Sequence, residues 1–351
     1  MAGRKLTLVL AACAAAALLV VAAAWTLLRA SDERANDQPI AGLDKARIVV
    51  VKPGSSLASV ASMLAGEGLL EHPDGWVRLA RREGVASRIR AGEYELLPGT
   101  TPRQVLDQMV SGRVLLHTVT IPEGWTFRQA VEAVMRHPAI LRTLDGAGEA
   151  PLRQALGLEK RSPEGMLFPD TYRFPRGTRD VEILRQARKR LEEELEVAWR
   201  KRLDDLPLET PYQALILASI VEKETGAPDE RPMIAGVFAN RLRLGMRLQT
   251  DPTVIYGLGE SFDGNLRRAD LTRDTPYNTY TRPGLPPTPI ALVGRAALEA
   301  AVRPADTEAI YFVATGLGDG RHRFARNLAE HNDNVARYIA SLRGASRNGA
   351  R

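Results

Sequence analysis

Two glutamates end one of the most apolar segments of the chain. Residues 211–225 read PYQALILASIVEKET, in which Glu222 and Glu224 follow an almost unbroken apolar run. Apolar side chains on nearly every side of a helix predict a buried helix, and Pro211 and Gly226 suit its first turn and its end. Burial and the negative end of the helix dipole both raise the pKa of a carboxyl group. A carboxyl that is protonated near neutral pH is suited to general acid catalysis.

Helical periodicity does not choose between the two glutamates. They are two residues apart, so their side chains leave the helix in different directions, and each continues an apolar stripe of its own. Glu224 is favoured because it lies closer to the C-terminal end of the helix, where the dipole disfavours an ionised carboxylate. The alternative is that one glutamate is exposed at a frayed end and the other pairs with Lys223 or an arginine.

Other familiar catalytic arrangements do not occur in the sequence. The five histidines are scattered without an HExxH motif, and the single cysteine, Cys13, lies in an apolar N-terminal segment. We therefore expect no metal, no cofactor and no thiol nucleophile. The formal net charge is +6 without a dense Lys/Arg stripe, so we do not expect nucleic-acid binding.

The apolar N-terminal segment predicts a membrane anchor. Residues from Leu6 to Leu28 carry no charge, and as a helix they would rise about 35 Å, enough to cross a bilayer. The basic residues before it place residues 1–5 in the cytoplasm and the rest of the chain outside. A cleaved signal peptide, which has a shorter apolar core, and a lipidation box ending at Cys13 are the alternatives. The polar residues 29–45 predict a linker.

A strand, a turn and a helix recur three times after the linker, over residues 48–64, 94–110 and 117–135. In each, a strand-like run stops at Pro-Gly or Pro-Glu-Gly, and Ser or Thr precedes a helical apolar pattern. A further helix is predicted over 74–85. In outline these units resemble the LysM carbohydrate-binding module, which implies a small LysM-like α+β domain over residues 46–116. Any other small α+β domain with the same turn residues is the alternative.

Longer elements follow from about residue 140. An extended segment is predicted over 246–259, and a Pro-rich loop over 277–290. The remaining predicted elements are helices over 180–203, 211–225, 232–244, 291–302 and 328–342 and a strand over 309–315.

Five long motifs, in order, closely resemble the YceG-like family of endolytic murein transglycosylases. They are EGMLFPDTYRF (164–174), ASIVEKET (218–225), FANRLRLGMRLQTDPTVIYG (238–257), YNTYTRPGLPPTPI (277–290) and FARNLAEHN (324–332). The resemblance implies a mainly helical, lysozyme-like catalytic domain with added strands over residues 117–345, in which 117–140 continue the repeat. The fold class is then α+β with one transmembrane helix.

The resemblance also implies an activity and a catalytic residue. The family cuts the β-1,4 bond between N-acetylmuramic acid and N-acetylglucosamine inside nascent peptidoglycan strands and leaves a 1,6-anhydro end. Its catalytic glutamate, the second of the EKE triplet, corresponds to Glu224. Because one carboxyl first donates and then accepts a proton, the second carboxylate of ordinary glycosidases is not needed.

The remaining motifs offer polar groups and flat rings for a sugar site. Asn240, Arg241 and Glu222 are expected to support the site, although Arg241 can instead neutralise a carboxylate. Asp251 can instead cap a turn before Pro252. The expected substrate-binding residues are Gln249, Thr250, Asp251, Tyr277, Asn278, Thr279 and Tyr280.

The expected partners are peptidoglycan glycan strands, the cell inner membrane through Leu6 to Leu28 and, by family only, peptidoglycan synthases. The catalytic domain is expected in the periplasm. Two other functions remain open. One is a non-catalytic peptidoglycan-binding scaffold in which Glu224 is structural. The other is a muramidase that uses water, with Glu222 or Asp251 as its second carboxylate.

Overall fold

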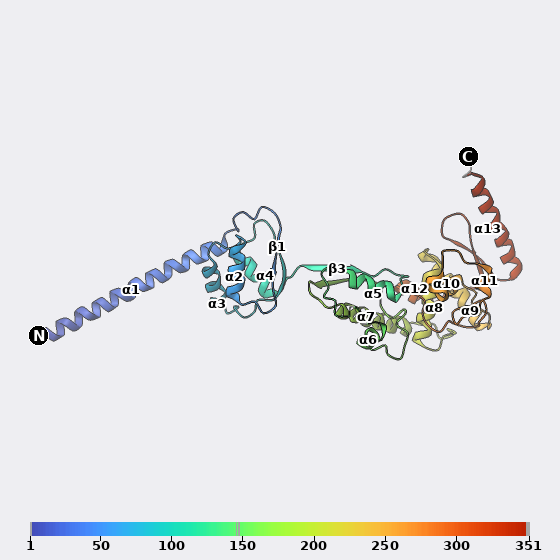
Figure 1. Ribbon diagram of the computed structural model, residues 1–351, viewed down its shortest axis with the longest axis horizontal. Coiled ribbons are helices and arrows are strands. Elements are labelled where there is room, and N and C mark those ends of the chain that lie inside the picture. Colours follow the sequence, from blue (N-terminus) through green and yellow to red (C-terminus); the bar gives the residue numbers. More distant parts are fainter. Residues whose placement is uncertain (1, 145, 147, 349–351) are drawn as a thin grey trace. The chain divides into compact units, whose positions relative to one another are not determined.

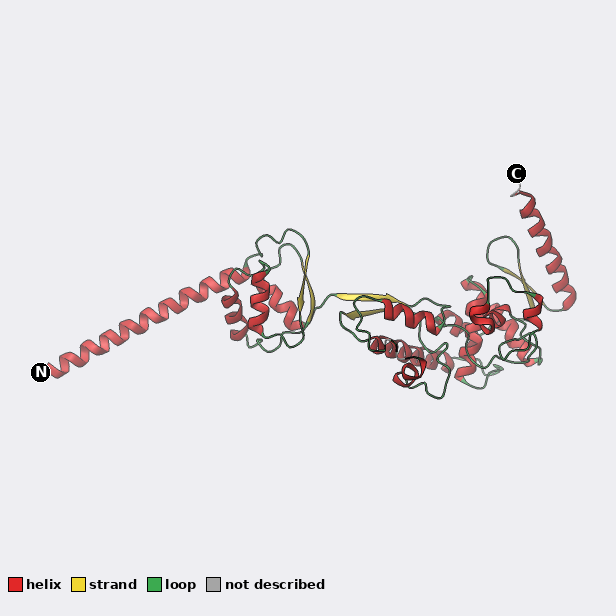
Figure 2. Cartoon of the chain, viewed as in Figure 1, coloured by secondary structure: helices red, strands yellow, loops and turns green. Residues whose placement is uncertain are grey.

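The chain divides into two compact units, Met1–His117 and Thr118–Arg351, and each is described by itself. The computed structural model describes residues 2–144, 146 and 148–348. Its helices and strands are labelled in Figure 1 and coloured by type in Figure 2. The structure is rich in helix, with small two-stranded antiparallel sheets β1–β2 and β5–β6 and a strand pair β3–β4.

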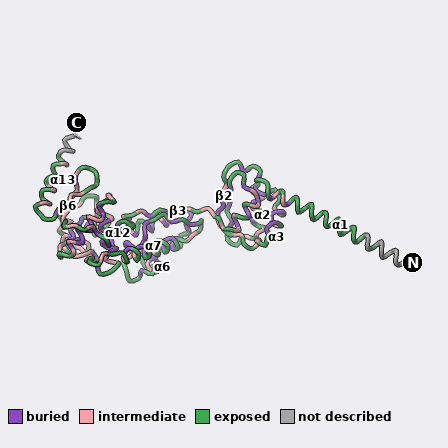
Figure 3. Tube along the Cα trace, turned by 180° about the vertical axis from the view of Figure 1, so that it is seen from behind, coloured by how far each residue is buried: buried purple, intermediate pink, exposed green. Residues whose placement is uncertain are grey.

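The first unit begins with the long helix α1 (Ala2–Asp37). Its residues Cys13–Asp37 are long and apolar enough to cross a membrane by length and composition, and Figure 3 shows the described apolar part exposed. The helix does not end at Leu28, so the prediction of a linker from residue 29 is wrong for residues 29–37.

The helical extension is held by buried polar groups. Arg78 donates to both carboxylate oxygens of Asp32 at 2.8 Å, and the Asn36 amide donates to the Asp32 carbonyl at 2.7 Å. A Cβ at Gly75 would lie only 2.7 Å from Asp32 Oδ1, so a glycine permits this approach. Arg78 lies 46 residues after Asp32, which is why local sequence reasoning missed this pairing.

The rest of the first unit pairs two strands beside three helices. Its elements are β1 (Arg47–Val51), α2 (Leu57–Gly66), α3 (Pro73–Arg82), β2 (Gly92–Leu96) and α4 (Pro102–Ser111). Strands β1 and β2 are antiparallel, with Arg47 opposite Leu96. Ser56 caps α2 and Thr101 forms a capping box on α4, so the predicted strand–turn–helix pattern is confirmed. The LysM resemblance stays a prediction.

The boundary between the two units falls after His117, within the strand of the third strand–turn–helix. Strand β3 (Leu116–Thr120) pairs with β4 (Thr171–Pro175), and Thr126 forms a capping box on the next helix. The helices of this part are α5 (Phe127–Arg136), α6 (Glu149–Ala155) and α7 (Asp180–Arg200).

The apolar segment that ends in two glutamates forms the central helix α8 (Pro211–Glu224). Every residue from Ala214 to Val221 is buried, and α8 packs against α7, α9 (Arg231–Arg243) and α12 (Arg295–Val302). The prediction of a buried helix is confirmed. The short η1 (Pro228–Glu230) joins α8 to α9.

The chain after α9 forms a helix where an extended segment was predicted. Helix α10 (Asp251–Leu258) begins after Thr250, with Pro252 in its first turn. The extended segment was predicted because β-branched residues such as those of the run Thr253–Ile255 favour strands. The preceding Thr-Asp-Pro is a good helix start, and the structure follows it. The remaining elements are η2 (Gly259–Ser261), α11 (Arg268–Thr272), β5 (Tyr311–Ala314), β6 (His322–Ala325) and α13 (Leu328–Asn348).

Candidate active site

Glu224 is the last residue of α8, and its half-buried carboxyl faces the start of α10. Its Oε2 accepts a hydrogen bond from Thr250 Oγ1 at 3.0 Å. Burial raises the pKa of Glu224 to about 7, and the negative charge of Asp251 acts in the same direction. The Thr250 hydroxyl and the charge of Arg241 lower this pKa. A pKa near 7 gives Glu224 access to both its protonated and its ionised form near neutral pH.

Thr250 is held in place by two other buried threonines. Its N–H donates to Thr279 Oγ1 at 3.1 Å, and Thr253 Oγ1 donates to the Thr250 carbonyl at 2.8 Å. The Thr253 and Thr279 hydroxyls lie 2.9 Å apart. Sequence reasoning missed Thr253, because its hydroxyl meets Thr279 only in the folded chain. The network fixes the hydroxyl that donates to Glu224.

The turn before α10 contains a strained residue. Gln249 has φ +51°, the one positive φ of a non-glycine residue within the described chain, a conformation that costs about 1–2 kcal/mol. Its N–H donates to the Thr279 carbonyl at 3.1 Å. The Gln249 side chain is exposed while that of Thr250 is buried. Strain of this kind concentrates at functional sites.

Asp251 and Tyr280 form a second polar pair beside Glu224. Tyr280 Oη donates to Asp251 Oδ1 at 2.6 Å. Burial, followed by this contact with Asp251, raises the pKa of Tyr280, so the phenol remains a hydrogen-bond donor at neutral pH. Asp251 is exposed and is the first residue of α10.

Asn240 and Arg241 brace the site from α9. Arg241 is buried, and it donates to the carbonyls of Ile310 at 2.7 Å and Leu248 at 2.6 Å. Burial lowers the pKa of Arg241. The Asn240 amide donates to two carbonyls in the segment before β5, at 2.6 and 3.0 Å. Arg241 thus holds the turn that leads to Thr250, and it acts on Glu224 through its charge.

Glu222 faces other elements than Glu224 does. Its side chain is 4% exposed, and Oε1 accepts from Arg231 at 3.0 Å. Oε2 accepts from the Gly294 N–H, at the start of α12, at 3.0 Å. Burial raises the pKa of Glu222, although Gly294 and Arg231 favour the ionised form. The pairing with an arginine that we considered for one glutamate is therefore found at Glu222, where it connects three helices.

Several polar side chains of the predicted sugar-binding loop, residues 277–280, form hydrogen bonds with other residues of the protein. Asn278 is 1% exposed, and its amide donates to the carbonyls of Asp270, Leu271 and Arg273. Tyr277 Oη lies 2.9 Å from the Thr288 hydroxyl. These contacts shape the loop and leave Tyr280 directed toward Asp251. A substrate contact by Tyr277, Asn278 or Thr279 stays a prediction.

Sequence reasoning missed a further buried carboxyl, that of Glu164. Its Oε1 accepts from the N–H groups of Phe127 and Gly165 at 2.9 and 3.1 Å. Its Oε2 accepts from Tyr256 Oη at 3.2 Å, and burial raises the pKa of Glu164. Because Tyr256 belongs to α10, this contact anchors the helix that carries Asp251. The signal was an acidic residue in the apolar motif EGMLF.

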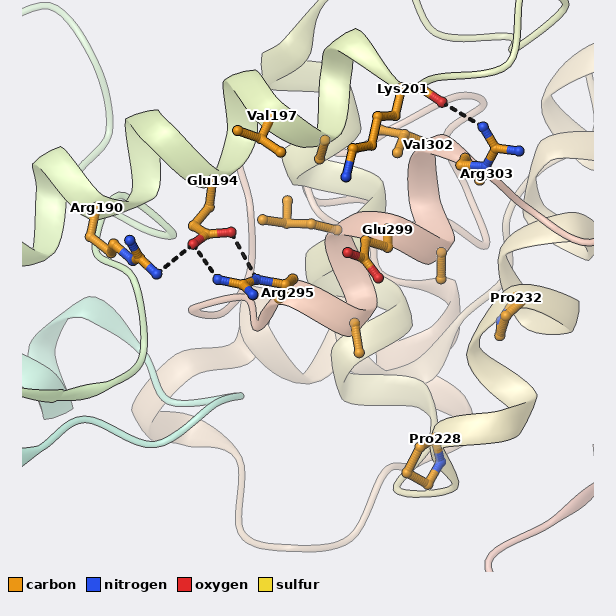
Figure 4. A pocket seen from close by; sticks show the side chains of 14 residues that line it. Arg190, Glu194, Val197, Lys201, Pro228, Pro232, Arg295, Glu299, Val302 and Arg303 are labelled. Atoms are coloured by element: carbon orange, nitrogen blue, oxygen red, sulfur yellow. Dashed lines mark hydrogen bonds and ion pairs between the residues drawn. The ribbon is translucent and has the colours of Figure 1, made fainter.

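A hollow of about 760 Å³ lies between α7 and α12, away from these residues (Figure 4). Glu194 accepts hydrogen bonds there from Arg295 at 2.5 and 2.9 Å, and it pairs with Arg190 at 2.8 Å. Neither Glu224 nor Thr250 lines it. This hollow therefore gives no support to the glutamate-centred chemistry.

The fold and the site define a helix-rich domain in which the pKa of one carboxyl group, that of Glu224, is raised to about 7. The model of the YceG-like family matches residues 49–337, which is most of the chain. The chain therefore belongs to the YceG-like family, and the resemblance drawn from the sequence is confirmed.

Two curated relatives of this chain carry the same name, and one solved structure is similar to it. An "Endolytic murein transglycosylase" of Bacillus subtilis (strain 168) is 30% identical over 313 residues, which covers 83% of this chain and 84% of the relative. One of Streptococcus pneumoniae (strain R6) is 27% identical over 345 residues, and the match covers 86% of this chain and 60% of the relative. A YceG-like protein from Listeria monocytogenes, whose crystal structure is known, is 29% identical in sequence to this chain. The two structures superpose with a TM-score of 0.51, and the match covers 83% of this chain and 99% of the Listeria chain.

Proposed function

We propose that this chain is an endolytic peptidoglycan lytic transglycosylase with Glu224 as its general acid and then base. The observation that carries the proposal is the carboxyl of Glu224, with a pKa near 7 and a fixed hydrogen bond from Thr250. The family and the names of the similar proteins support the substrate, a glycan strand.

The chemistry needs one carboxyl and no water. Protonated Glu224 donates its proton to the oxygen of the β-1,4 bond between N-acetylmuramic acid and N-acetylglucosamine, and the bond from that oxygen to C1 breaks. The positive charge that develops at C1 has oxocarbenium character. The muramyl C6 hydroxyl then attacks C1 and gives its proton to the Glu224 carboxylate. The strand ends in a 1,6-anhydro sugar, and Glu224 is again protonated.

A pKa near 7 suits both halves of this reaction. A carboxyl with an ordinary pKa would be ionised at neutral pH and unable to donate, whereas a far higher pKa would favour holding the proton. Thr250 orients the carboxyl, and we place the sugar beside the exposed Gln249 side chain and the Asp251–Tyr280 pair. Arg241 holds the turn beneath them.

The expected location follows from α1 and the family. We place α1 across the inner membrane as a single-pass anchor, with residues 1–5 in the cytoplasm and the catalytic unit outside. The tether limits the enzyme to newly made glycan near the membrane. Glycan binding by the first unit and association with peptidoglycan synthases belong to the same proposal.

The test is digestion of uncrosslinked glycan strands that carry stem peptides, by full-length protein in detergent. Mass spectrometry should find fragments lighter by one water than hydrolysis products with wild type, and none with Glu224→Gln. The control Glu196→Gln changes an exposed glutamate of α7 that pairs with Arg200 and with no other described residue, and should cut normally. Strands that bind but are not cut by any form would favour the scaffold.

The alternative of a muramidase that uses water is supported by one observation, the position of Asp251. Its charge is close enough to raise the pKa of Glu224, whereas Glu222 is occupied by Arg231 and Gly294. A muramidase would release fragments of full hydrolytic mass, and Asp251→Asn would abolish the activity. A transglycosylase would keep cutting in that variant.

A further inference from the structure

Folding returns the arginines of α3 to the end of the apolar segment of α1. A hollow of about 220 Å³ lies there, within the first unit. It is lined by Trp25, Leu28, Arg29, Asp32, Arg78, Arg81 and Arg82, so four arginines face one carboxylate. The arginines of α3 are about fifty residues downstream of Leu28, which hides the cluster from any count of charges flanking the apolar segment.

The acidic groups nearby pair with three of the four arginines and leave Arg81 without an acidic partner among the described residues. Asp32 is occupied by Arg78 through two hydrogen bonds of 2.8 Å. Glu33 is shared, at 3.0 Å from Arg29 and 3.7 Å from Arg82. Asp74 acts on Arg78 through its charge.

Arg81 is exposed, and no described residue pairs with it. Its guanidinium therefore keeps its donors free for a ligand. A planar guanidinium suits a phosphate group because it can donate two parallel hydrogen bonds.

The depth of the hollow along α1 suits the headgroup layer of a membrane. Trp25 and Leu28 are exposed apolar residues at the end of the segment, and the Arg29 guanidinium lies 5.6 Å from the centre of the Trp25 ring. Tryptophan is enriched at membrane interfaces. Asp32 lies about 10 Å further along the helix than Trp25, a length comparable with the headgroup layer that flanks the hydrocarbon core.

We propose that this hollow binds the phosphate of an anionic phospholipid, with Arg81 and Arg29 at the phosphate and Trp25 and Leu28 against the lipid chains. The apolar rim distinguishes such a ligand from a free phosphate, which has nothing to place against Trp25. Bound lipid would seat α3 on the membrane surface and fix the first unit there. The inference depends on α1 crossing the membrane and is independent of the chemistry of Glu224.

The experiment is native mass spectrometry of the full-length protein released from nanodiscs of equal parts phosphatidylglycerol and phosphatidylcholine. Wild type should retain phosphatidylglycerol preferentially, and Arg81→Gln should reduce that preference about fivefold, the effect of one arginine near an anionic surface. The control Arg88→Gln changes an exposed arginine outside the hollow and should behave as wild type.

Two further measurements are needed. One distinguishes a lipid phosphate from free phosphate, and the other distinguishes lost lipid binding from lost folding. Inorganic phosphate added in excess should not displace the lipid; displacement would show a general phosphate site and overturn the lipid assignment. Arg78 is left intact because it pairs with Asp32, and an unchanged melting temperature of Arg81→Gln should show that its fold is preserved. If that variant unfolds, Arg29→Gln replaces it with the same expectation. Equal retention of the two lipids by wild type, or an equal loss with Arg88→Gln, would overturn the proposal.

Discussion

Two neighbours of Glu224 shift its pKa in opposite directions, which gives a paired prediction at the scale of single residues. The Thr250 hydroxyl lowers this pKa and the Asp251 charge raises it. Cleavage needs the protonated acid, so the wild-type rate should fall as the pH rises through about 7. Thr250→Val should move this decline to higher pH, and Asp251→Asn should move it to lower pH. The measurement is kcat/KM for glycan cleavage against pH.

The opposite signs of the two shifts make this prediction demanding. A variant that only loosened the site would lower the rate at every pH without moving the decline. Shifts of the same sign in both variants would contradict the electrostatic account of Glu224.

The raised pKa of Glu224 also predicts a cost in stability. Because the folded-state pKa is about 7 and the ordinary value is 4.5, the folded protein loses stability as the pH rises between those values. Glu224→Gln should therefore be more stable than wild type at pH 8, by about 1–3 kcal/mol, with a smaller difference at pH 5. Urea unfolding at both pH values measures it.

Glu222→Gln is the matched control for this stability effect. It removes the closest carboxylate from the buried Arg231, whose other acidic neighbour, Glu123, is 3.8 Å away. We expect a destabilisation of about 1–3 kcal/mol at both pH values. A gain in stability there, or none in Glu224→Gln at pH 8, would contradict the different roles assigned to the two glutamates.

At the scale of elements, substitutions of Gln249 in the turn before α10 distinguish the effect of backbone strain from the effect of the side-chain amide. Gln249 holds φ +51°, so Gln249→Gly should raise the free energy of unfolding by about 0.5–1 kcal/mol because glycine adopts this conformation without strain. It should also weaken activity, because the exposed amide is lost. Denaturation and KM for glycan strands measure the two effects.

Gln249→Ala is the control for the turn, since it removes the amide but keeps the strain. Activity should fall alike in the alanine and glycine variants, while only glycine gains stability. Full activity in both would remove Gln249 from the site.

Helices and strands that are specified by their own local residues were predictable from the sequence. Helix α8 was predicted because its apolar run, its Pro211 start and its glutamates are all local. Helix α10 was not, because the preference of Thr253 and its β-branched neighbours for strands was overridden in the fold, where Pro252 lies in the first turn of the helix. The extension of α1 to Asp37 depends on the pairing of Asp32 with Arg78, and a contact across 46 residues leaves no periodicity to detect.

The same distinction holds within the candidate site. Glu224, Thr250 and Asp251 were expected together from the family motifs, and the structure brings them together around one hydrogen bond. Glu164 escaped notice because only the fold shows that Tyr256 and two backbone N–H groups surround it. The internal hydrogen bonds of Asn278 likewise depend on the path of a loop that no local pattern specifies.

At the scale of the whole molecule, the end of α1 belongs to the first unit as well as to the anchor. Asp32 pairs with Arg78, and Asp37 accepts from Arg103 at 2.6 Å. A soluble form of residues 30–351 should therefore keep the first unit intact, whereas residues 38–351 should lose about 1–3 kcal/mol of its stability. Urea unfolding followed by the fluorescence of buried Trp76, with Trp125 and Trp199 of the second unit replaced by phenylalanine in both forms, reports on this unit. Equal stability of the two forms would contradict the described packing of α1.

The central claim is that Glu224 directs an internal hydroxyl, and not water, to the cut sugar. The most direct measurement is digestion of glycan strands in water labelled with ¹⁸O, followed by mass spectrometry of the new ends. A muramidase digest in the same solvent shows how incorporated label appears. The account predicts unlabelled products that are lighter by one water, formed by wild type and not by Glu224→Gln. Label at the new reducing ends would show that water attacks, and it would contradict the account.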